Sequence, residues 1–322
     1  MSRLGLWLFL CFCLCVGTAS AQVAAGTLVG VVHDPSQAVV PGAKLVVTHL
    51  GTGETRQVTT NERGEFRIPF VRTGQYSVSA EVAAFKKTTL TGIEVRVDQT
   101  VNVNIVLDVG SISESVEVTS AAPLIDSSTS SLGQVIDNRK IQDLPLVGRN
   151  TFALGLLAGN TVPMSGMGSN LPFVAGGGRF QHNDVQLDGI DNNTSATGGS
   201  IGVQGIGYTP SVDAVQEFKV KTNNFSAEYG RSAGAIITAT IKSGTNRFQG
   251  SLFEYLRNEK FDANNFFSNK GGVRRQPYKQ NQFGFTLGGP VRIPKVYNGV
   301  DRTWFFTDYE GTRRRTSASS SV

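Results

Sequence analysis

The chain has 322 residues, which is room for two or three domains with their own cores. Charged residues make up 17% and there are 37 glycines, a composition that favours β-structure with many turns. The net charge is +5, and the segment from Arg257 to Arg315 holds 12 Lys and Arg against 5 Asp and Glu. These cations stand singly between aromatic and Gly-rich runs, so nucleic acid is not a predicted partner.

Residues 1–21 are predicted to be a signal peptide. Arg3 precedes an apolar run from Leu4 to Val16 that is too short to span a membrane, and Ala19 and Ala21 fit an A-x-A cleavage site. All three cysteines lie inside this segment. The mature chain is therefore predicted to be exported and to lack disulfides, zinc-thiolate sites and cysteine nucleophiles.

Residues 22–109 are predicted to form a small β-sandwich, because runs of period two alternate with turn residues. In "GQYSVSAEV", for example, Tyr76, Val78 and Ala80 share one face and the intervening polar residues face water. Seven such runs occur in order: "TLVGVVH", "AKLVVTHL", "TRQVTT", "EFRIPF", "GQYSVSAEV", "TTLTGIEVRV" and "TVNVNIVLDV".

This segment, from "GTLVGVVHDPSQAVVPGAKLVVT" to "TNERGEFRIPFVRTGQYSVSAE", resembles the carboxypeptidase regulatory-like family. The resemblance implies a prealbumin-like sandwich without catalytic residues of its own. Some relatives of this fold bind carbohydrate, for which Tyr76 and Phe85 are the candidates here. Packing in the core and in a turn is the favoured interpretation for both residues.

Residues 110–132 are predicted to be an extended linker, since they are rich in Ser and Thr and poor in apolar side chains. Inside it, "ESVEVTS" from Glu114 to Ser120 alternates Val with polar residues. Such a segment can add as a strand to the sheet edge of a partner. A solvated linker with incidental alternation is the simpler interpretation of the residues alone.

Residues 133–245 are predicted to mix short helices and strands, with Pro145 stopping the first helix. In order, the elements are a helix capped by Asp137 and running through Gln142, an apolar turn from Phe152 to Leu157, a helical turn from Val212 to Phe218 leading into a strand that ends near Lys221, and a strand from Ala235 to Ile241.

Four ordered motifs in this region resemble the plug of TonB-dependent receptors: "LPLVGRN", "GGGRFQHNDVQLDGIDNN", "VDAVQEFKV" and "SAEYGRSAGAIITATIKSGTNRFQGSLFEYLRN". A regulatory-like domain ahead of the plug resembles, more narrowly, the Oar-like branch of that family. The resemblance implies a TonB-type energy-coupling protein in the periplasm as a partner. It also implies a TonB-contacting segment, with these candidates: Glu114, Ser115, Val116, Glu117 and Val118.

Three arginines beside glycines in these motifs, Arg149, Arg179 and Arg231, are candidates for a plug-wall role. In that role they would pair with acidic residues of the barrel wall and hold the plug in the lumen, and the resemblance favours this role for Arg179 and Arg231. The alternative is that they are solvated turn residues.

An enzyme is the minority interpretation. Gly176 to Arg179 lacks the Lys-Ser/Thr of a phosphate loop, and "LDGIDNN" is interpreted as a turn in which Gly189 adopts positive φ. Asp184, Asp188 and Asp191 lack the spacing of a calcium loop. The three histidines are scattered, and no G-x-S-x-G elbow occurs. No cofactor, metal or catalytic residue is predicted.

Residues 246–322 are predicted to begin an outer-membrane β-barrel. In "NQFGFTLGGP", Phe283, Phe285 and Leu287 share one face, and "RTWFFTDYEG" is rich in aromatics. Apolar-out, polar-in alternation with interfacial aromatics is typical of a transmembrane strand. The connection between the strands fits a long outer loop whose Arg274 and Arg275 are candidates to face lipopolysaccharide phosphates.

The predicted fold class is therefore mainly β: a prealbumin-like sandwich, an α+β plug and the first strands of an incomplete barrel. At most three or four strands fit after residue 246, whereas bacterial barrels begin at about eight, so a fragment is expected. The predicted function is the amino-terminal part of an energy-coupled receptor in the outer membrane, with an unknown extracellular ligand. The alternative is a secreted carbohydrate-binding or adhesion module.

Overall fold

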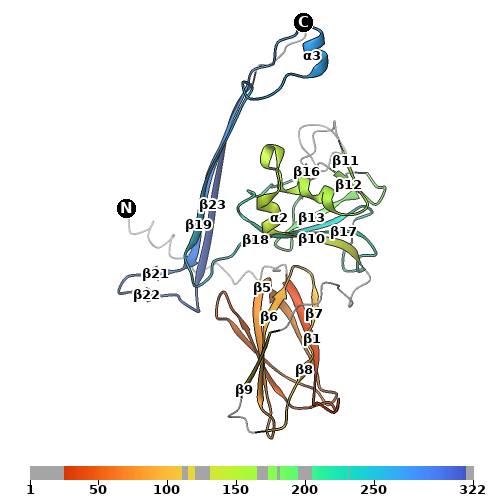
Figure 1. Ribbon diagram of the computed structural model, residues 1–322, viewed down its shortest axis with the longest axis vertical. Coiled ribbons are helices and arrows are strands. Elements are labelled where there is room, and N and C mark those ends of the chain that lie inside the picture. The colour runs from red at the N-terminus through yellow and green to blue at the C-terminus, as the bar shows by residue number, and fades with distance from the viewer. Residues whose placement is uncertain are drawn as a thin grey trace, which may run out of the picture.

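The described part of the chain is mainly β and forms three bodies (Figure 1). The sandwich (red to yellow) lies below a middle domain (green), and a long three-stranded sheet (blue) rises beside the middle domain. The predicted cleavage residues Ala19 and Ala21, together with Glu114 and Arg231, lie outside the described residues. The computed structural model describes residues 25–110, 115–119, 131–164, 173–179, 182–194, 205–230 and 232–316.

The sandwich consists of two sheets, and every predicted run forms a strand. One sheet contains β4 (Glu65–Arg72), β1 (Ala25–His33), β7 (Thr100–Asn102) and β8 (Ile105–Val106), with β1 pairing to the other three. The other has, in spatial order, β3 (Thr55–Thr59), β2 (Lys44–His49), β5 (Gly74–Glu81), β6 (Lys87–Val95) and β9 (Ser115–Thr119).

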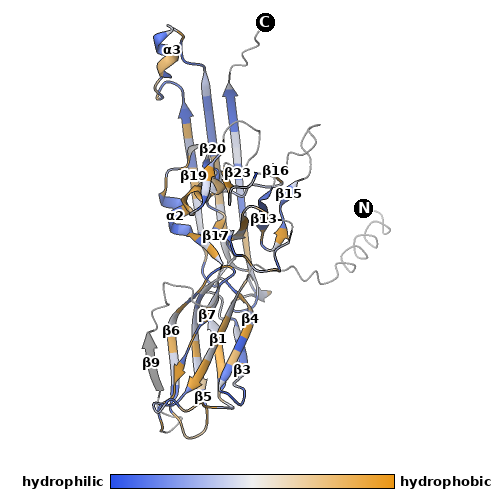
Figure 2. Ribbon diagram, turned by 90° about the vertical axis from the view of Figure 1, so that its right-hand side faces the viewer, coloured by the Kyte–Doolittle hydropathy of each residue, from blue (hydrophilic) through white to orange (hydrophobic). Residues whose placement is uncertain are grey.

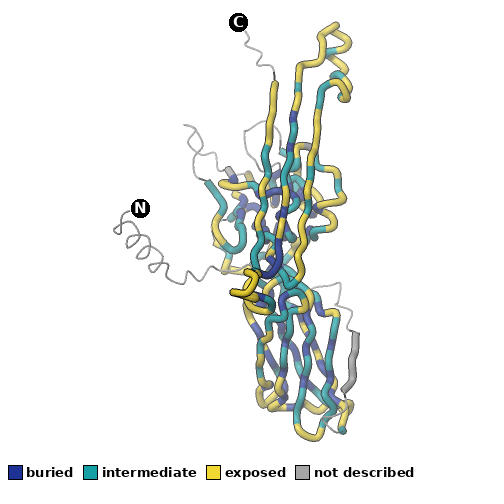
Figure 3. Tube along the Cα trace, turned by 90° about the vertical axis from the view of Figure 1, so that its left-hand side faces the viewer, coloured by how far each residue is buried: buried dark blue, intermediate teal, exposed yellow. Residues whose placement is uncertain are grey.

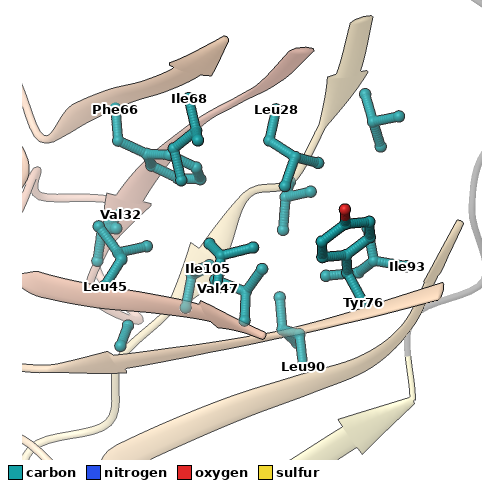
Figure 4. Packing of buried hydrophobic residues seen from close by; sticks show 14 of the residues in the cluster. Leu28, Val32, Leu45, Val47, Phe66, Ile68, Tyr76, Leu90, Ile93 and Ile105 are labelled. Atoms are coloured by element: carbon teal, nitrogen blue, oxygen red, sulfur yellow. The ribbon is translucent and has the colours of Figure 1, made fainter. Parts of the chain in front are cut away.

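The inward faces of these two sheets make one apolar core (Figure 4). Alternate residues of β5 point into it, and Val78 and Ala80 are fully buried. Tyr76 is 5% exposed and its hydroxyl donates to the Arg72 carbonyl at 2.8 Å, while Phe85 packs against the rim of the core. Both residues therefore pack within the sandwich, as the favoured interpretation of the sequence predicted.

Part of the predicted linker is a strand. Ser115–Thr119, β9, pairs in parallel with β6, from Lys87↔Ser115 to Thr91↔Thr119. The alternating segment therefore extends a sheet edge, and the edge belongs to the sandwich of the same chain. The next described strand, β10, begins at Leu132.

The middle domain is built on a five-stranded mixed sheet. Its spatial order is β10 (Leu132–Asp137), β17 (Val215–Asn223), β18 (Ile236–Ile241), β13 (Asp184–Leu187) and β14 (Ile190–Asp191). Two short pairs flank it: β11 (Thr161–Pro163) with β12 (Phe173–Ala175), and β15 (Asn193–Thr194) with β16 (Gly205–Ile206). A second core, including Phe152, Phe173 and Phe218, lies between the sheet and the helical turns.

Three short helical elements connect β10 to β11. They are α2 (Asn138–Asp143), η1 (Val147–Arg149) and η2 (Thr151–Leu157). As predicted, Asp137 caps α2, its Oδ1 accepting from the Lys140 amide at 2.9 Å. Among the described residues, no helix is both long and apolar enough to cross a membrane.

The predicted helical turn from Val212 to Phe218 is wrong beyond its first residues. A turn occupies residues 212–214, and β17 begins at Val215 and continues to Asn223. This strand pairs with β10 on one side and β18 on the other and is buried on both faces. Val212, Val215 and Phe218 recur at every third residue, as on a helix face, and a register shift between Val215 and Glu217 interrupts the alternation, which explains why the start of the strand was misread.

Three long antiparallel strands follow: β19 (Gln249–Asn258), β20 (Tyr278–Pro290) and β23 (Trp304–Thr316). The loop between β19 and β20 contains α3 (Phe266–Lys270), and the hairpin β21 (Arg292–Ile293) and β22 (Tyr297–Asn298) lies between β20 and β23. As predicted, β20 alternates: Phe285 and Leu287 are exposed, whereas Gln282 and Thr286 are buried. Figures 2 and 3 show the hydropathy and burial along this sheet.

The sandwich core provides a matched test of this packing. Val78→Ala removes two methyl groups from a fully buried site, so we expect a loss of about 2 kcal/mol in unfolding free energy. Val106→Ala makes the same change on β8, where the side chain is 45% exposed, and should cost much less. Denaturant unfolding of both variants measures the difference, and equal losses would contradict this core.

Candidate functional site between the middle domain and the three-stranded sheet

Arg149 lies in a tight turn between α2 and η2. Gly148 and Arg149 both have left-handed backbones, with φ of 75° and 52°. The next residue, Asn150, caps η2 by accepting from the Phe152 amide at 3.0 Å. A non-glycine residue in this region stores on the order of 1–3 kcal/mol of strain. The turn therefore depends on contacts made by the Arg149 side chain.

Those contacts join the middle domain to the three-stranded sheet. The Arg149 Nη2 donates to Asp213 Oδ2 at 2.5 Å, and its Nε lies 3.8 Å from Glu310 Oε2 of β23. The guanidinium also lies 4.7 Å from the ring centre of Phe253 and 4.1 Å from that of Tyr255, both on β19. Only 8% of the side chain is exposed, so cation–π and ionic contacts act in a largely desolvated site.

A second contact closes the same junction. Ser211 Oγ donates to Asp308 Oδ2 of β23 at 2.9 Å, next to a cavity of about 560 Å³ that is lined by both bodies. Burial, together with the charges of Asp308 and Glu310, raises the pKa of Tyr208 at this cavity. Three carboxylates, those of Asp213, Asp308 and Glu310, thus gather near Arg149, and the junction has an acidic character.

The sandwich contacts the middle domain through the turn between β6 and β7. The Val97 amide donates to Glu217 Oε1 at 2.5 Å, and Lys219 Nζ donates to the Asp98 carbonyl at 2.7 Å. Lys221 forms an ion pair with the Asp98 carboxylate. Glu217 is 6% exposed, and burial raises its pKa to about 7 although the Val97 amide favours the charged form.

The sandwich also contacts the lower end of the three-stranded sheet, through Asn246. Its backbone amide donates to the Gly51 carbonyl at 3.0 Å, and its Nδ2 donates to the Thr52 carbonyl at 2.9 Å and to Asp301 Oδ1 at 2.6 Å. Its Oδ1 accepts from the Asp301 amide at 2.9 Å and from Trp304 Nε1 at 2.8 Å. All four hydrogen-bonding positions of the side-chain amide are therefore used.

Of the three predicted plug-wall arginines, Arg149 reaches the sheet. Arg179 is exposed, and its backbone amide donates to His182 Nδ1 at 3.3 Å. Arg231 lies outside the described residues. A wall role for Arg179 and Arg231 stays a prediction.

Asp188 and Asp191 of "LDGIDNN", and Asp184 just before it, form hydrogen bonds within this turn region. Asp184 and Asp191 both accept from Asn193 Nδ2, each at 2.6 Å, and Asp188 accepts from the Ile241 amide at 3.0 Å. Gly189 has φ of 81°, as the turn interpretation required. Within the described residues, no group of three or more His, Cys, Asp and Glu side chains is arranged to hold a metal ion.

Comparison with known proteins supports this organisation. Residues 27–108 match the family described as carboxypeptidase regulatory-like domain, and residues 240–322 match the outer membrane beta barrel domain. Over 308 residues the chain is 29% identical to the TonB-dependent transporter Oar of Myxococcus xanthus, a match that covers 92% of this chain. The chain is a homologue of that transporter. The predicted resemblance to the Oar-like branch is confirmed.

The chain spans 28% of the length of the curated relative that it matches. The barrel-domain match and the transporter homologue support the predicted location, and the protein belongs to the outer membrane. Among solved structures, the siderophore receptor PirA of Acinetobacter baumannii is similar with a TM-score of 0.41 and 20% identity, covering 60% of this chain and 26% of PirA. Catechol 1,2-dioxygenase of Acinetobacter radioresistens gives a TM-score of 0.23 at 14% identity, covering 33% and 59%.

The sequence analysis did not identify the residues that Arg149 contacts. Asp213 stands in the "VDAVQEFKV" motif, and Glu310 ends the aromatic run of the last strand. Alternation along "RTWFFTDYEG" places Asp308 and Glu310 on the face opposite Phe305 and Tyr309, which is the signal that marks them as inward-facing acids. Apart from the Ser-Gly-Thr turn that precedes it, nothing in the sequence marks Asn246 as an interdomain contact.

Arg149 and Arg139 form a matched pair of variants in the middle domain. Arg149→Ala leaves Asp213 and Glu310 without their cation, and we expect the junction to lose about 3 kcal/mol. Under the plug-wall prediction, cells that make this variant should admit more of a large antibiotic by passive entry. Arg139→Ala removes the same charge from α2, where 91% of the side chain is exposed, and should leave entry unchanged; equal entry in the two variants would count against a plug-wall role for Arg149.

The contact of Glu217 with Val97 predicts a pH dependence. Because the pKa of Glu217 is raised from 4.5 to about 7, the folded state binds the proton more tightly, and this stabilisation is complete below about pH 4.5 and lost as pH rises through 7. We expect Glu217→Gln to remove a dependence on the order of a few kcal/mol.

Thermal unfolding at several pH values measures this change. Groups that face Glu217, namely Arg96, Glu94 and Lys219, stay in both proteins. A stability difference between wild type and Glu217→Gln that is constant from pH 5 to 8 would show that Glu217 has an ordinary pKa.

Proposed function

We propose that the chain forms the amino-terminal part of an energy-coupled outer-membrane receptor. In this proposal the sandwich lies in the periplasm, the middle domain is the plug, and β19, β20 and β23 are the first barrel strands. The single observation that supports it best is the contact of Arg149 with Glu310, Phe253 and Tyr255. A plug needs a holding contact of this kind with the inner wall, and the receptor performs no chemistry on its ligand.

The chemistry of the two faces of the sheet supports the same arrangement. The face toward the middle domain bears Gln282, Asp308 and Glu310, which suit a water-filled or protein-filled lumen. The opposite face bears Leu252 and Phe285, which are exposed and suit lipid. The middle domain therefore lies on the side that becomes the lumen when the sheet closes.

Closure requires more strands than the three described here. β19 and β23 each pair on one side only within this sheet, and unpaired backbone groups are strongly unfavourable in hydrocarbon. We therefore propose that the barrel is completed by strands beyond this sequence. Reading the coding sequence after residue 322 tests this proposal, and several hundred residues of alternating ten-residue strands are expected. A stop codon there, together with secretion of the protein in soluble form, would contradict the receptor proposal.

The TonB-type partner is proposed to contact the segment that includes β9. β9 is the edge strand of its sheet, so a partner strand can pair with its free edge or replace its pairing with β6. The chain then continues to β10, which is the edge strand of the middle sheet and, among the described strands, pairs with β17 alone. A pull on the segment is thus transmitted to an edge of the proposed plug and not to its centre.

The alternative, a carbohydrate-binding adhesion module, has little support. Tyr76 is 5% exposed and uses its hydroxyl within the sandwich, and Phe85 is partly buried against the same core. A sugar-stacking ring needs an exposed face. The extracellular ligand of the receptor, carbohydrate or other, is therefore assigned to no residue of this chain.

Proline substitution tests the coupling segment. Val116→Pro removes a backbone donor in the middle of β9, so we expect it to abolish cross-linking of a nearby cysteine to the periplasmic domain of a TonB-type protein. Ala121→Pro lies outside the candidate segment and should keep cross-linking close to the wild-type level. Full cross-linking in Val116→Pro would exclude a strand-pairing contact at this position.

A further inference from the structure

His49 occupies a narrow slot at the end of β2, beside the turn that meets the three-stranded sheet. Its ring packs edge-on against Tyr76, a residue of the sandwich core (Figure 4), with ring centres 4.8 Å apart and planes at 87°. Two glycines complete the slot. A Cβ on Gly51 would lie 2.9 Å from His49 Cε1, and a Cβ on Gly74 would lie 2.4 Å from Nε2. The surrounding residues therefore hold the ring in one orientation.

The hydrogen bonds of the ring define its protonation state. The amides of Gly51 and Thr52 both donate to His49 Nδ1, each at 3.1 Å, so this nitrogen carries a lone pair. The proton of the neutral imidazole then lies on Nε2, which donates to the Thr73 carbonyl at 3.4 Å. His49 thus accepts from the turn that follows it, as an Asn or Asp side chain does in an Asx turn.

One peptide group links this ring to the three-stranded sheet. The peptide between Gly51 and Thr52 donates its N–H to His49, and its carbonyl accepts from the Asn246 amide at 3.0 Å. The next carbonyl, that of Thr52, accepts from Asn246 Nδ2 at 2.9 Å. Because the N–H and C=O of a planar trans peptide point in opposite directions, the ring fixes the orientation of the group that Asn246 contacts.

Protonation of His49 is incompatible with this arrangement. An imidazolium carries a proton on both nitrogens, so Nδ1 would face two amide donors and no acceptor. Rotation of the Gly51–Thr52 peptide would present its carbonyl to the protonated nitrogen, and a glycine at position 51 tolerates the necessary change in backbone angles. The same rotation turns that carbonyl away from Asn246. A proton on His49 is therefore gained at the expense of a contact between two bodies.

Several charged and titratable groups face His49. Burial lowers the pKa of His49, with a smaller contribution in the same direction from Arg72 of β4, whereas the carbonyl bonded to Nε2 and the charge of Glu54 raise it. Tyr76 packs against the ring from β5, and Asp301 faces the turn from the side of the three-stranded sheet. The net direction favours the neutral ring.

The sign of the pH dependence follows from this direction. Because the folded protein binds the proton on His49 less tightly than the unfolded chain, the contribution of the neutral ring is complete above about pH 6.5 and is lost as pH falls through the lowered pKa. The contact of Glu217 with Val97 has the opposite dependence, since protonation stabilises it. Acidification thus weakens one contact of the sandwich and strengthens the other.

We propose that His49 is a proton-operated switch between the sandwich and the three-stranded sheet. Neutral His49 holds the Gly51–Thr52 peptide toward Asn246, and protonated His49 releases it. In acid the sandwich separates from the sheet at Asn246 and stays attached to the middle domain through Glu217. This switch goes beyond the receptor function, because it depends on the contacts of His49 and not on energy coupling.

The experiment uses the full-length product of the gene, purified in detergent and freed of other reactive cysteines. Nitroxide labels are attached to Gln57→Cys on β3 of the sandwich and to Val296→Cys on the hairpin at the lower end of the sheet (Figure 1). Both side chains are exposed. Pulsed electron paramagnetic resonance measures the distances between the labels at about pH 7.5 and about pH 5, on either side of the titration range of histidine.

Wild type should give one narrow distance at the higher pH. At the lower pH we expect a longer-distance population that is larger by at least about fivefold, the factor that corresponds to the loss of one hydrogen bond. His49→Asn offers a side-chain carbonyl to the same two amides at every pH, so it should keep the narrow distance at both. The matched control is His33→Asn, which removes the other histidine of the sandwich, one that contacts the Asp34 carbonyl, and should respond like wild type.

A broad distribution at both pH values, an unchanged wild-type distance in acid, an equal acid response in His49→Asn, or loss of the response in His33→Asn would each overturn the proposal. The wild-type comparison involves no substitution at the junction, so it decides the matter even if His49→Asn does not fold. Failure of the cross-linking to a TonB-type protein would contradict the coupling segment and leave the switch untouched.

Discussion

The placement of the sandwich against the three-stranded sheet depends on the hydrogen bonds of Asn246. This residue follows β18 and precedes β19, so it stands where the middle domain ends and the three-stranded sheet begins. Its amide group joins the Thr52 carbonyl, the Asp301 backbone and side chain, and the Trp304 indole. No other small side chain offers two donors and two acceptor positions in one plane, so the residue type is fixed by the geometry. Close packing around it adds a further constraint, because a Cβ on Gly244 would lie 2.2 Å from the Phe305 carbonyl oxygen.

The buried charges of the chain gather at the boundaries between bodies and not in the cores. Arg149, Glu217 and Lys221 are each less than 10% exposed, and each meets a partner from another body. Buried ion pairs add little net stability compared with apolar packing, but an unpaired partner is strongly unfavourable. Such contacts therefore fix how one body is placed against the next. They also let a body leave into water at moderate free-energy cost, since the separated charges become hydrated.

Local patterning was enough to predict much of the fold. The seven runs of the sandwich, the Asp137 cap and the two faces of β20 follow from period-two alternation and capping chemistry, which depend on neighbouring residues only. The start of β17 could not be predicted, because the register shift between Val215 and Glu217 interrupts the alternation at that point. The pairing of β9 with β6 could not be predicted either, since the sequence shows that a segment can be a strand but not which edge it joins.

Only the arginines of the candidate site were predicted from the sequence, and their acidic and aromatic partners were not. Gly-Arg spacing drew attention to Arg149, Arg179 and Arg231, the family resemblance favoured the last two, and nothing in the sequence singles out Arg149. The difference arises from the tertiary structure: the turn at Arg149 faces β19 and β23, while that at Arg179 is exposed. Contact partners such as Asp213 and Glu310 are 64 and more residues away along the chain, and long-range pairs of this kind are set by the packing of whole domains.

The three sets of interdomain contacts differ in which bodies they join. The Asn246 set joins the sandwich to the three-stranded sheet, and the middle domain takes no part in it. The Arg149 set and the Glu217 set, in contrast, both hold the middle domain, one against the sheet and the other against the sandwich. Displacement of the middle domain therefore has to break two ionic sets while the third stays intact. Such a displacement would leave the sandwich attached to the sheet through Asn246.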